Sequence, residues 1–208
     1  MNDSPQTAPA VLTGPELLRL RRVADRDEIR QLAFRYAWGL DSRDVAAVAS
    51  LYLPDTGSGS GGPDAMLRRF HRSMSAVGVT ILFVGNHLID FDSDDDAHGL
   101  VYCRGYIEPR DSPHPGRYIE QAILYRDTYR RHEGVWKFVA RSHELWYGIE
   151  TAERPLHQRA ARWPLHHDGV GTVPYGEASW REFWGGHPDV AAPGSGAGSA
   201  SEEALPDG

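Results

Sequence analysis

The spacing of apolar residues predicts one long helix near the start of the chain. Between Asp25 and Asp41, apolar side chains recur at i, i+3, i+4, i+7, i+8 and i+11, the repeat of a single helix face. Phe34 and Trp38 lie on the opposite side, so we expect the helix to be clamped between two layers. Asp25 or Asp27 is a candidate cap for its start. The residues of the main face are Ile29, Leu32, Ala33, Tyr36, Ala37 and Leu40.

Two more helices and then four strands follow in the pattern. A second helix is expected over 45–53, where Pro54 stops it, and a third over 64–76. After Gly78 the apolar period becomes that of strands. Helices followed by an antiparallel meander indicate an α+β domain. The expected strands cover 79–91, 97–108, 117–131 and 135–147.

The ends of the chain differ from this middle part in composition. Residues 1–19 are polar and Pro-containing at first, which predicts a flexible arm, although a short helix is expected to start at 15–22. The domain itself is expected over 20–150. Residues 151–190 are predicted to pack on the domain or on a partner, because disordered segments are poor in aromatic residues and this one holds three tryptophans. Residues 191–208 are predicted to be a disordered tail. The three tryptophans are Trp163, Trp180 and Trp184.

Charge and cysteine content exclude several classes of protein. The formal net charge of −7, without a basic patch, disfavours nucleic-acid binding. The single cysteine, Cys103, rules out an internal disulfide and fits a cytoplasmic location. No apolar run approaches the roughly 20 residues that span a bilayer. The acidic run over 92–96 lacks the spacing of a calcium loop and predicts a solvated turn. The histidines match no metal-site spacing, so no metal is expected.

Two residues of the long helix are candidates for chemistry. Tyr36 lies on the apolar face, and Asp41 lies at the helix end. Each also has a purely structural interpretation. Tyr36 would then be a core tyrosine whose hydroxyl finds a partner, and Asp41 would cap the second helix together with Asp44.

Three segments together resemble a known superfamily. They read RYAWGLDSRD, FVGNHLIDF and YRDTYRRHEGVWKFVARSHELWYG. In order and spacing they are similar to the nuclear-transport-factor-2-like superfamily, and most of all to its SnoaL-like branch, which includes polyketide cyclases, scytalone dehydratase and bile acid dehydratase. The resemblance covers residues 20–150. It implies a cone-shaped α+β roll, in which a curved, mainly antiparallel sheet of four or more strands wraps the helices and encloses one apolar pocket.

The resemblance also implies catalytic roles. Asp41 would be the acid–base group, or would orient a histidine or water, and Tyr36 would donate a hydrogen bond to the substrate. The dehydratases carry a histidine on the first long strand, at the position of Leu82 here. His87 is the candidate to replace it, but in a regular strand it would face the other side of the sheet. A bulge at Gly85 would reverse that.

Further residues are candidates for contact with a ligand, with roles in the core or in cross-strand packing as the alternative. The function expected from the resemblance is cofactor-independent acid–base catalysis, such as dehydration, isomerisation or cyclisation, on a small polyketide-, aromatic- or steroid-like ring. The alternatives are a non-catalytic binding or assembly subunit, or an epoxide hydrolase. A homodimer is expected because the strands at 99–107 and 136–147 are apolar on both faces. The ligand-contact candidates are Trp38, Leu82, Asn86, Tyr106, Gln121, Tyr125 and His143.

Overall fold

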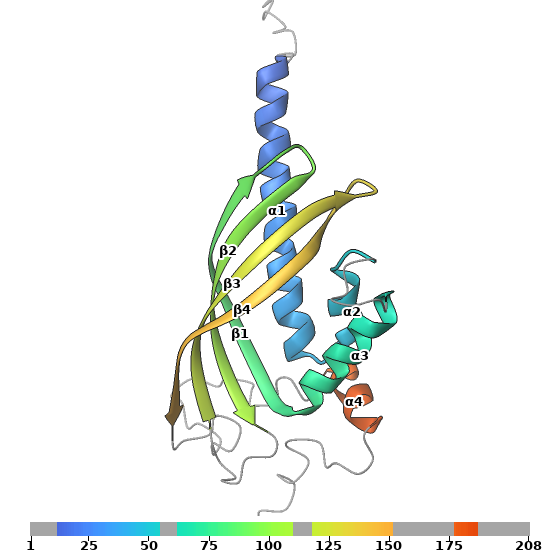
Figure 1. Ribbon diagram of the computed structural model, residues 1–208, viewed down its shortest axis with the longest axis vertical. Helices are drawn as coiled ribbons and strands as arrows, with labels where there is room; N and C mark the ends of the chain where they lie inside the picture. Colours follow the sequence, from blue (N-terminus) through green and yellow to red (C-terminus); the bar gives the residue numbers. More distant parts are fainter. Residues whose placement is uncertain (1–11, 55–61, 110–117, 152–176, 187–208) are drawn as a thin grey trace, which may run out of the picture.

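The computed structural model describes residues 12–54, 62–109, 118–151 and 177–186. Its sheet has the order β1-β2-β3-β4, every neighbouring pair is antiparallel, and it curves around the long first helix (Figure 1). The expected α+β cone is therefore confirmed. The elements are α1 (Gly14–Asp41), α2 (Val45–Ser50), α3 (Gly62–Ser75), β1 (Val77–Phe91), β2 (Asp96–Pro109), β3 (Tyr118–His132), β4 (Val135–Thr151) and α4 (Ala178–Gly185).

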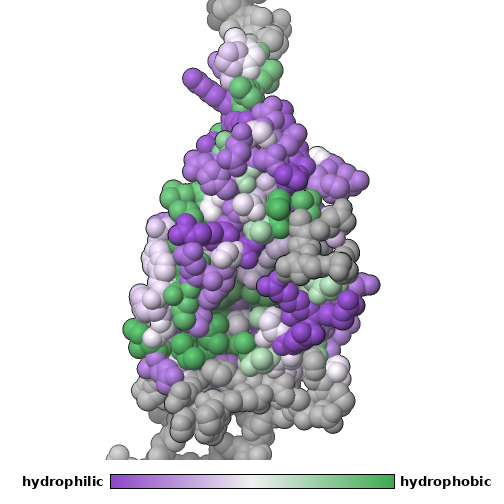
Figure 2. All heavy atoms as spheres, viewed as in Figure 1, coloured by the Kyte–Doolittle hydropathy of each residue, from purple (hydrophilic) through white to green (hydrophobic). Residues whose placement is uncertain are grey.

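Helix α1 begins earlier than the apolar pattern predicts. Thr13 precedes its first residue, and the Thr13 backbone N–H donates to the Glu16 carboxylate at 2.8 Å. Residues 14–19 are therefore helical and continuous with α1, and not a flexible arm; residues 1–11 lie outside the described part. The first turns of α1 project beyond the sheet and leave hydrophobic side chains exposed (Figures 1 and 2). These side chains are Leu17, Leu18, Leu20 and Val23.

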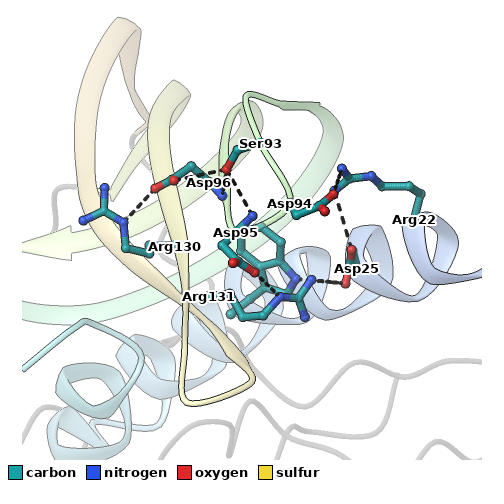
Figure 3. A network of polar contacts seen from close by, with 9 residues as sticks. Arg22, Asp25, Ser93, Asp94, Asp95, Asp96, Arg130 and Arg131 are labelled. Atoms are coloured by element: carbon teal, nitrogen blue, oxygen red, sulfur yellow. Dashed lines mark hydrogen bonds and ion pairs between the residues drawn. The ribbon is translucent and has the colours of Figure 1, made fainter. Parts of the chain in front are cut away.

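Asp25 does not cap a helix, because it lies well inside α1. Its carboxylate is buried and accepts hydrogen bonds from Arg131 Nη2 at 2.5 Å and from Trp136 Nε1 at 3.2 Å. Neighbouring ion pairs fix the β1–β2 turn to α1 and β3 (Figure 3). The acidic run over 92–96 is thus a surface turn whose carboxylates face arginines. Its pairs are Asp94 with Arg22, Asp95 with Arg131 and Asp96 with Arg130.

The far side of α1 is not covered within the described part of the chain. Phe34 is 43% exposed and Trp38 is 54% exposed. The expected clamp between two layers is therefore wrong for this protomer, because the sheet curves around only one side of the helix. Two apolar helix faces predict two contacts, but they do not say whether the second contact lies in the same chain.

Helix α2 is shorter than predicted, because the residues after it join the sheet. The Phe138 N–H donates to the Leu51 carbonyl at 2.9 Å, and the Leu53 N–H donates to the Phe138 carbonyl at 3.0 Å. Tyr52 thereby forms a short parallel bridge to β4. Backbone groups of Leu51 and Leu53 that an extended helix would have used are satisfied by β4 instead.

Helix α4 packs against the end of α1, although it is far away in the sequence. Trp180 and Trp184 are only 2% and 3% exposed, which confirms the prediction for these two tryptophans. The Ser179 hydroxyl donates to the Ser42 carbonyl at 2.8 Å. The guanidinium of Arg43 lies 4.9 Å from the Trp180 ring. Trp163 and the predicted tail lie outside the described residues.

Candidate functional site

A cavity of about 600 Å³ lies between α3, β4 and the C-terminal part of α1. Tyr36 of α1 and Tyr125 of β3 both line it, with ring centres 5.9 Å apart. Phe70 of α3 meets the Tyr36 ring at 6.2 Å, and His143 of β4 meets the Tyr125 ring at 5.5 Å. Three residues predicted for the site, Tyr36, Tyr125 and His143, therefore share one cavity. Its walls also include Tyr52, Arg69, Ser73, Arg141 and Ser142.

Three tyrosine rings lie in the wall of the cavity. They belong to Tyr36, Tyr52 and Tyr125, and Tyr125 is only 4% exposed. Burial raises the pKa of each of these phenols, so they stay protonated and remain donors. The wall of the cavity therefore offers phenol donors to a ligand.

Asp41 does not cap α2, because Asp44 does so by accepting from the Ala47 N–H at 2.9 Å. The Asp41 Oδ2 atom instead accepts from the backbone N–H of Leu82 at 2.9 Å. Its Oδ1 atom is buried without a hydrogen-bond partner. Asp41 therefore contacts the backbone at the strand position where the dehydratases carry a histidine. The carboxyl is not among the residues that line the 600 Å³ cavity, which Tyr36 reaches about one and a half turns earlier in α1.

The environment of Asp41 makes its acidity unusual. Burial raises the pKa of this carboxyl to about 7, although the Leu82 N–H, the Thr80 hydroxyl and the charge of Arg43 act in the opposite direction. Arg43 does not pair with the carboxylate. It has a positive φ of 64° and binds other groups near the start of β1. Its hydrogen-bond acceptors are the carbonyls of Leu40, Val77 and Gly78 and the hydroxyl of Thr80.

His87 faces the inside of the cone. The β1–β2 register shifts between Val84 and His87, where two residues of β1 oppose one residue of β2. One extra residue is thus inserted in β1, which reverses the parity of the strand. The His87 Nε2 atom lies 2.9 Å from the Tyr129 hydroxyl, and its Nδ1 atom is buried without a hydrogen-bond partner. Burial lowers the pKa of His87 to about 4, so the imidazole is neutral at physiological pH.

Arg141 and Asp127 form a buried ion pair that the sequence did not predict. Arg141 Nε lies 2.8 Å from Asp127 Oδ1, and Arg141 Nη2 lies 2.6 Å from Oδ2. The guanidinium also lies 4.4 Å from the ring centres of both Tyr36 and Tyr125. Arg126 pairs with Glu144 on the opposite face of β3, as strand alternation predicts for two adjacent residues. The same alternation, applied to β3 and β4, is the sequence signal that could have placed Asp127 and Arg141 on the inner face of the sheet.

The remaining candidates lie apart from this cavity. Leu82 packs between two clusters of the core. Asn86 and Gln121 line a separate groove of about 430 Å³ in the sheet, together with exposed side chains such as Tyr102 and Trp146. Tyr106 stacks on Tyr118, with ring centres 5.8 Å apart. Trp38 lies on the exposed side of α1, so its expected contact with the ligand is not supported here.

Neither a metal centre nor a membrane span is found in the part of the chain that the structure describes. Within these residues no three His, Cys, Asp or Glu side chains group in a way that suits a metal ion. The described helices also include none with both the length and the apolar character needed to cross a bilayer.

Comparison with known proteins identifies the family. The model of the SnoaL-like domain matches residues 21–142, which is more than half of the chain. The protein belongs to the SnoaL-like family. A search of curated proteins returns no significant match.

Solved structures of the same fold include enzymes. A hexachlorocyclohexane dehydrochlorinase of type 2 is 26% identical, with a TM-score of 0.57 over 64% of this chain and 93% of the other. The type 3 enzyme from Novosphingobium barchaimii is 25% identical, with a TM-score of 0.57 over 64% and 94%. An NTF2-like protein with a cystatin-like fold from Novosphingobium aromaticivorans is 24% identical, with a TM-score of 0.52 over 66% and 92%, and shows the fold alone.

Proposed function

We propose that this SnoaL-like protein is a lyase or isomerase that moves a proton on a small cyclic substrate without a cofactor. The observation that carries the proposal is the Asp41 carboxyl, which is buried, has one oxygen without a hydrogen-bond partner and has a pKa raised to about 7. Such a group is partly ionised near neutral pH, so it can both accept and return a proton. The similarity to dehydrochlorinases, which are elimination enzymes, supports the same class of reaction.

The role of Asp41 follows from its acidity, and the roles of Tyr36 and Arg141 follow from their place in the cavity wall. Asp41 would take a proton from a carbon atom, and the electrons of the broken C–H bond would form a double bond as a leaving group departs, or an enolate if none departs. Tyr36 would donate a hydrogen bond to the oxygen that gains negative charge. Arg141, held beside Tyr36, would donate a second hydrogen bond at the same place. A polyketide-, aromatic- or steroid-like ring is the substrate class that the aromatic lining favours.

The test is turnover by matched aspartate variants. Purified protein would be screened against chlorinated cyclohexanes, hydroxylated cyclic ketones and phenolic polyketide mimics, with products followed by chromatography. Asp41→Asn should lower turnover about 10²–10⁴-fold, the range for loss of an acid–base group, with little change in melting temperature. Asp44→Asn is the control, because asparagine caps a helix about as well as aspartate and the Asp44 carboxylate makes the cap contact. Full activity of Asp41→Asn would overturn the assignment.

A non-catalytic binding protein is the second candidate. Two observations favour it: the dehydratase histidine is replaced by Leu82, and Asp41 is not in the lining of the cavity. The fold alone does not establish chemistry. If the protein binds members of the same panel tightly but converts none of them, binding is its function and Asp41 is a structural residue.

We also infer a homodimer that covers the outer face of the sheet. Large hydrophobic side chains remain exposed there in the protomer, which is unusual for a monomer when they are contiguous. Light scattering at micromolar concentration should give twice the protomer mass, and a monomeric mass would contradict the inference. The exposed residues are Phe83, Leu88, Tyr102, Trp146, Tyr147 and Ile149.

A further inference from the structure

A chain of four polar side chains crosses the inside of the cone. Asp127 is at its centre and accepts hydrogen bonds from Arg141 on one side and from the Tyr129 hydroxyl, at 2.7 Å, on the other. His87 continues the chain beyond Tyr129. Asp127 and Tyr129 are 2% and 1% exposed, so none of these contacts at Asp127 is a surface ion pair. The family resemblance implied no role for Asp127, Tyr129 or Arg141.

The direction of each hydrogen bond is fixed by the number of hydrogens. Tyr129 has one hydroxyl hydrogen, and it is donated to Asp127, which as a carboxylate can only accept. His87 must therefore donate its Nε2 hydrogen to the Tyr129 oxygen. This makes His87 the neutral tautomer with hydrogen on Nε2 and a lone pair on Nδ1. All donors in the chain point toward Asp127.

Two features of the strands make room for this chain. The β1 bulge turns His87 inward, and Gly99 of β2 leaves space beside it. A Cβ atom at position 99 would lie 3.3 Å from His87 Nε2, 3.3 Å from a ring carbon of Tyr129 and 2.6 Å from the Leu88 carbonyl oxygen. A side chain at this position would thus collide with the backbone and crowd the hydrogen bond between His87 and Tyr129.

The other end of the chain reaches the cavity. Arg141 uses Nε and Nη2 for Asp127, which leaves Nη1 outside this ion pair. The guanidinium lines the cavity between the rings of Tyr36 and Tyr125. Because Asp127 balances its charge, Arg141 offers a directed donor without a net positive charge. None of the described residues that line the cavity is an Asp or a Glu.

We propose that Asp127, Tyr129 and His87 are positioning residues that hold Arg141 with one nitrogen directed into the cavity. This nitrogen and the neighbouring phenols bind an uncharged planar ligand through the oxygen acceptors of the ligand. The proposal deepens the proposed function, because it takes the same cavity as the substrate site. It does not depend on Asp41. Preorganised donors of this kind bind an oxygen, and hold it more strongly as it gains charge, at no cost of reorientation.

The test combines one conservative variant with two measurements that do not need the substrate. Tyr129→Phe keeps the ring, which packs 5.5 Å from Phe138, and removes only the hydroxyl. The first measurement is hydrogen exchange of the Arg141 Nε–H by ¹⁵N NMR, which should become at least fivefold faster in Tyr129→Phe. The second is titration with 2-naphthol, an uncharged planar probe, whose affinity should fall about five- to tenfold. In the wild type, ¹⁵N shifts should show His87 with hydrogen on Nε2.

The controls separate this proposal from simple packing and from the proposed function. Arg126→Gln changes a neighbour on the outer face of β3 and should leave both measurements unchanged. His87→Gln can still donate to Tyr129 and should retain more 2-naphthol affinity than His87→Leu. Asp41→Asn should leave 2-naphthol affinity unchanged even if it abolishes turnover. If Tyr129→Phe matches the wild type in both measurements, the positioning role is wrong; if the wild type fails to bind 2-naphthol, the proposed ligand class is wrong.

Discussion

Asp25 lies near the middle of α1 and Asp41 lies at its end, and they differ in the groups that surround them. Asp25 is buried with Arg131 at 2.5 Å and Arg22 at 3.8 Å, and it also accepts from Trp136 (Figure 3). Burial would raise its pKa, but the hydrogen bonds from Arg131 and Trp136 outweigh burial and lower it. Asp41 makes no ion pair within the described residues, and burial raises its pKa to about 7.

The difference shows how one residue type serves two purposes. An arginine within hydrogen-bond distance keeps a buried carboxylate ionised and makes it part of the scaffold. Without that partner, the same group is left with an acidity suited to proton transfer. Arg43 is near Asp41 in sequence, but it is committed to backbone carbonyls at the start of β1. Among the described residues, Asp25 therefore has an arginine within hydrogen-bond distance, and Asp41 does not.

The largest effect on folding is expected at Asp25. Asp25→Asn would leave Arg131 without its shortest ion pair and should lower the free energy of unfolding by about 3 kcal/mol, at the lower end for a broken buried pair. The loss is moderated because Arg131 keeps Asp95 at 3.0 Å. Urea unfolding measures it. Asp41→Asn is the matched variant and should change stability far less; equal losses would erase the distinction between the two sites.

A competing site for the acid–base group is tested by His87→Ala. Because His87 holds Tyr129 and does not line the cavity, we expect a loss of turnover of about tenfold, well below that of Asp41→Asn. If His87→Ala abolishes turnover while Asp41→Asn barely changes it, the histidine is the base and our assignment is wrong.

Tyr36→Phe should have a smaller effect than loss of Asp41. It removes one hydrogen-bond donor and keeps the ring that packs against the Arg141 guanidinium at 4.4 Å. A loss in kcat of about tenfold with little change in KM is expected, because the donor acts on charge that develops during the reaction. An unchanged kcat would remove Tyr36 from the proposed mechanism.

The dependence of stability on pH should differ in sign between Asp41 and His87. The pKa of Asp41 is raised to about 7 from an ordinary 3.8, so between these pH values the folded state binds more protons than the unfolded state. The contribution of Asp41 to stability therefore falls as the pH rises from 3.8 to 7. The lowered pKa of His87, about 4 against 6.5, has the opposite effect, and its contribution rises over that range. Removing Asp41 should therefore make stability rise more steeply with pH between 4 and 7, as thermal melts in a pH series would show.

Local patterns predicted most of the fold. The strand ranges were within a few residues of those in the structure, because alternation and turn residues are local signals. The start of α1 was predicted too late, since Asp25 and Asp27 resembled caps while the true start at Gly14 lies in a stretch with exposed leucines. The real role of Asp25 depends on Arg131 and Trp136, more than 100 residues away.

The site was less predictable, because its geometry depends on irregularities in the strands. Regular alternation places His87 on the outer face, and only the alternative of a bulge at Gly85 places it inside, as the register shift does. Asp127 of β3 pairs directly with Arg141 of β4. A register shift between Thr128 and Tyr129 separates this pair from the hairpin turn, so counting from the turn does not predict the pairing. Tyr36, which lines the cavity, could be placed on the apolar face because it lies on a regular helix. Residues on regular elements can be placed from sequence, whereas residues beyond a bulge cannot.

The most direct measurement is the pKa of Asp41 itself. The side-chain carboxyl carbons of Asp41 and Asp25 can be followed by ¹³C NMR across a pH titration, with Asp41→Asn and Asp25→Asn used to assign the two signals. We expect Asp41 to titrate with a midpoint near 7 and Asp25 to titrate below the ordinary value of 3.8. If Asp41 also titrates near 3.8, it is a permanently ionised carboxylate, and the contrast with Asp25 and the proposed proton transfer both fail.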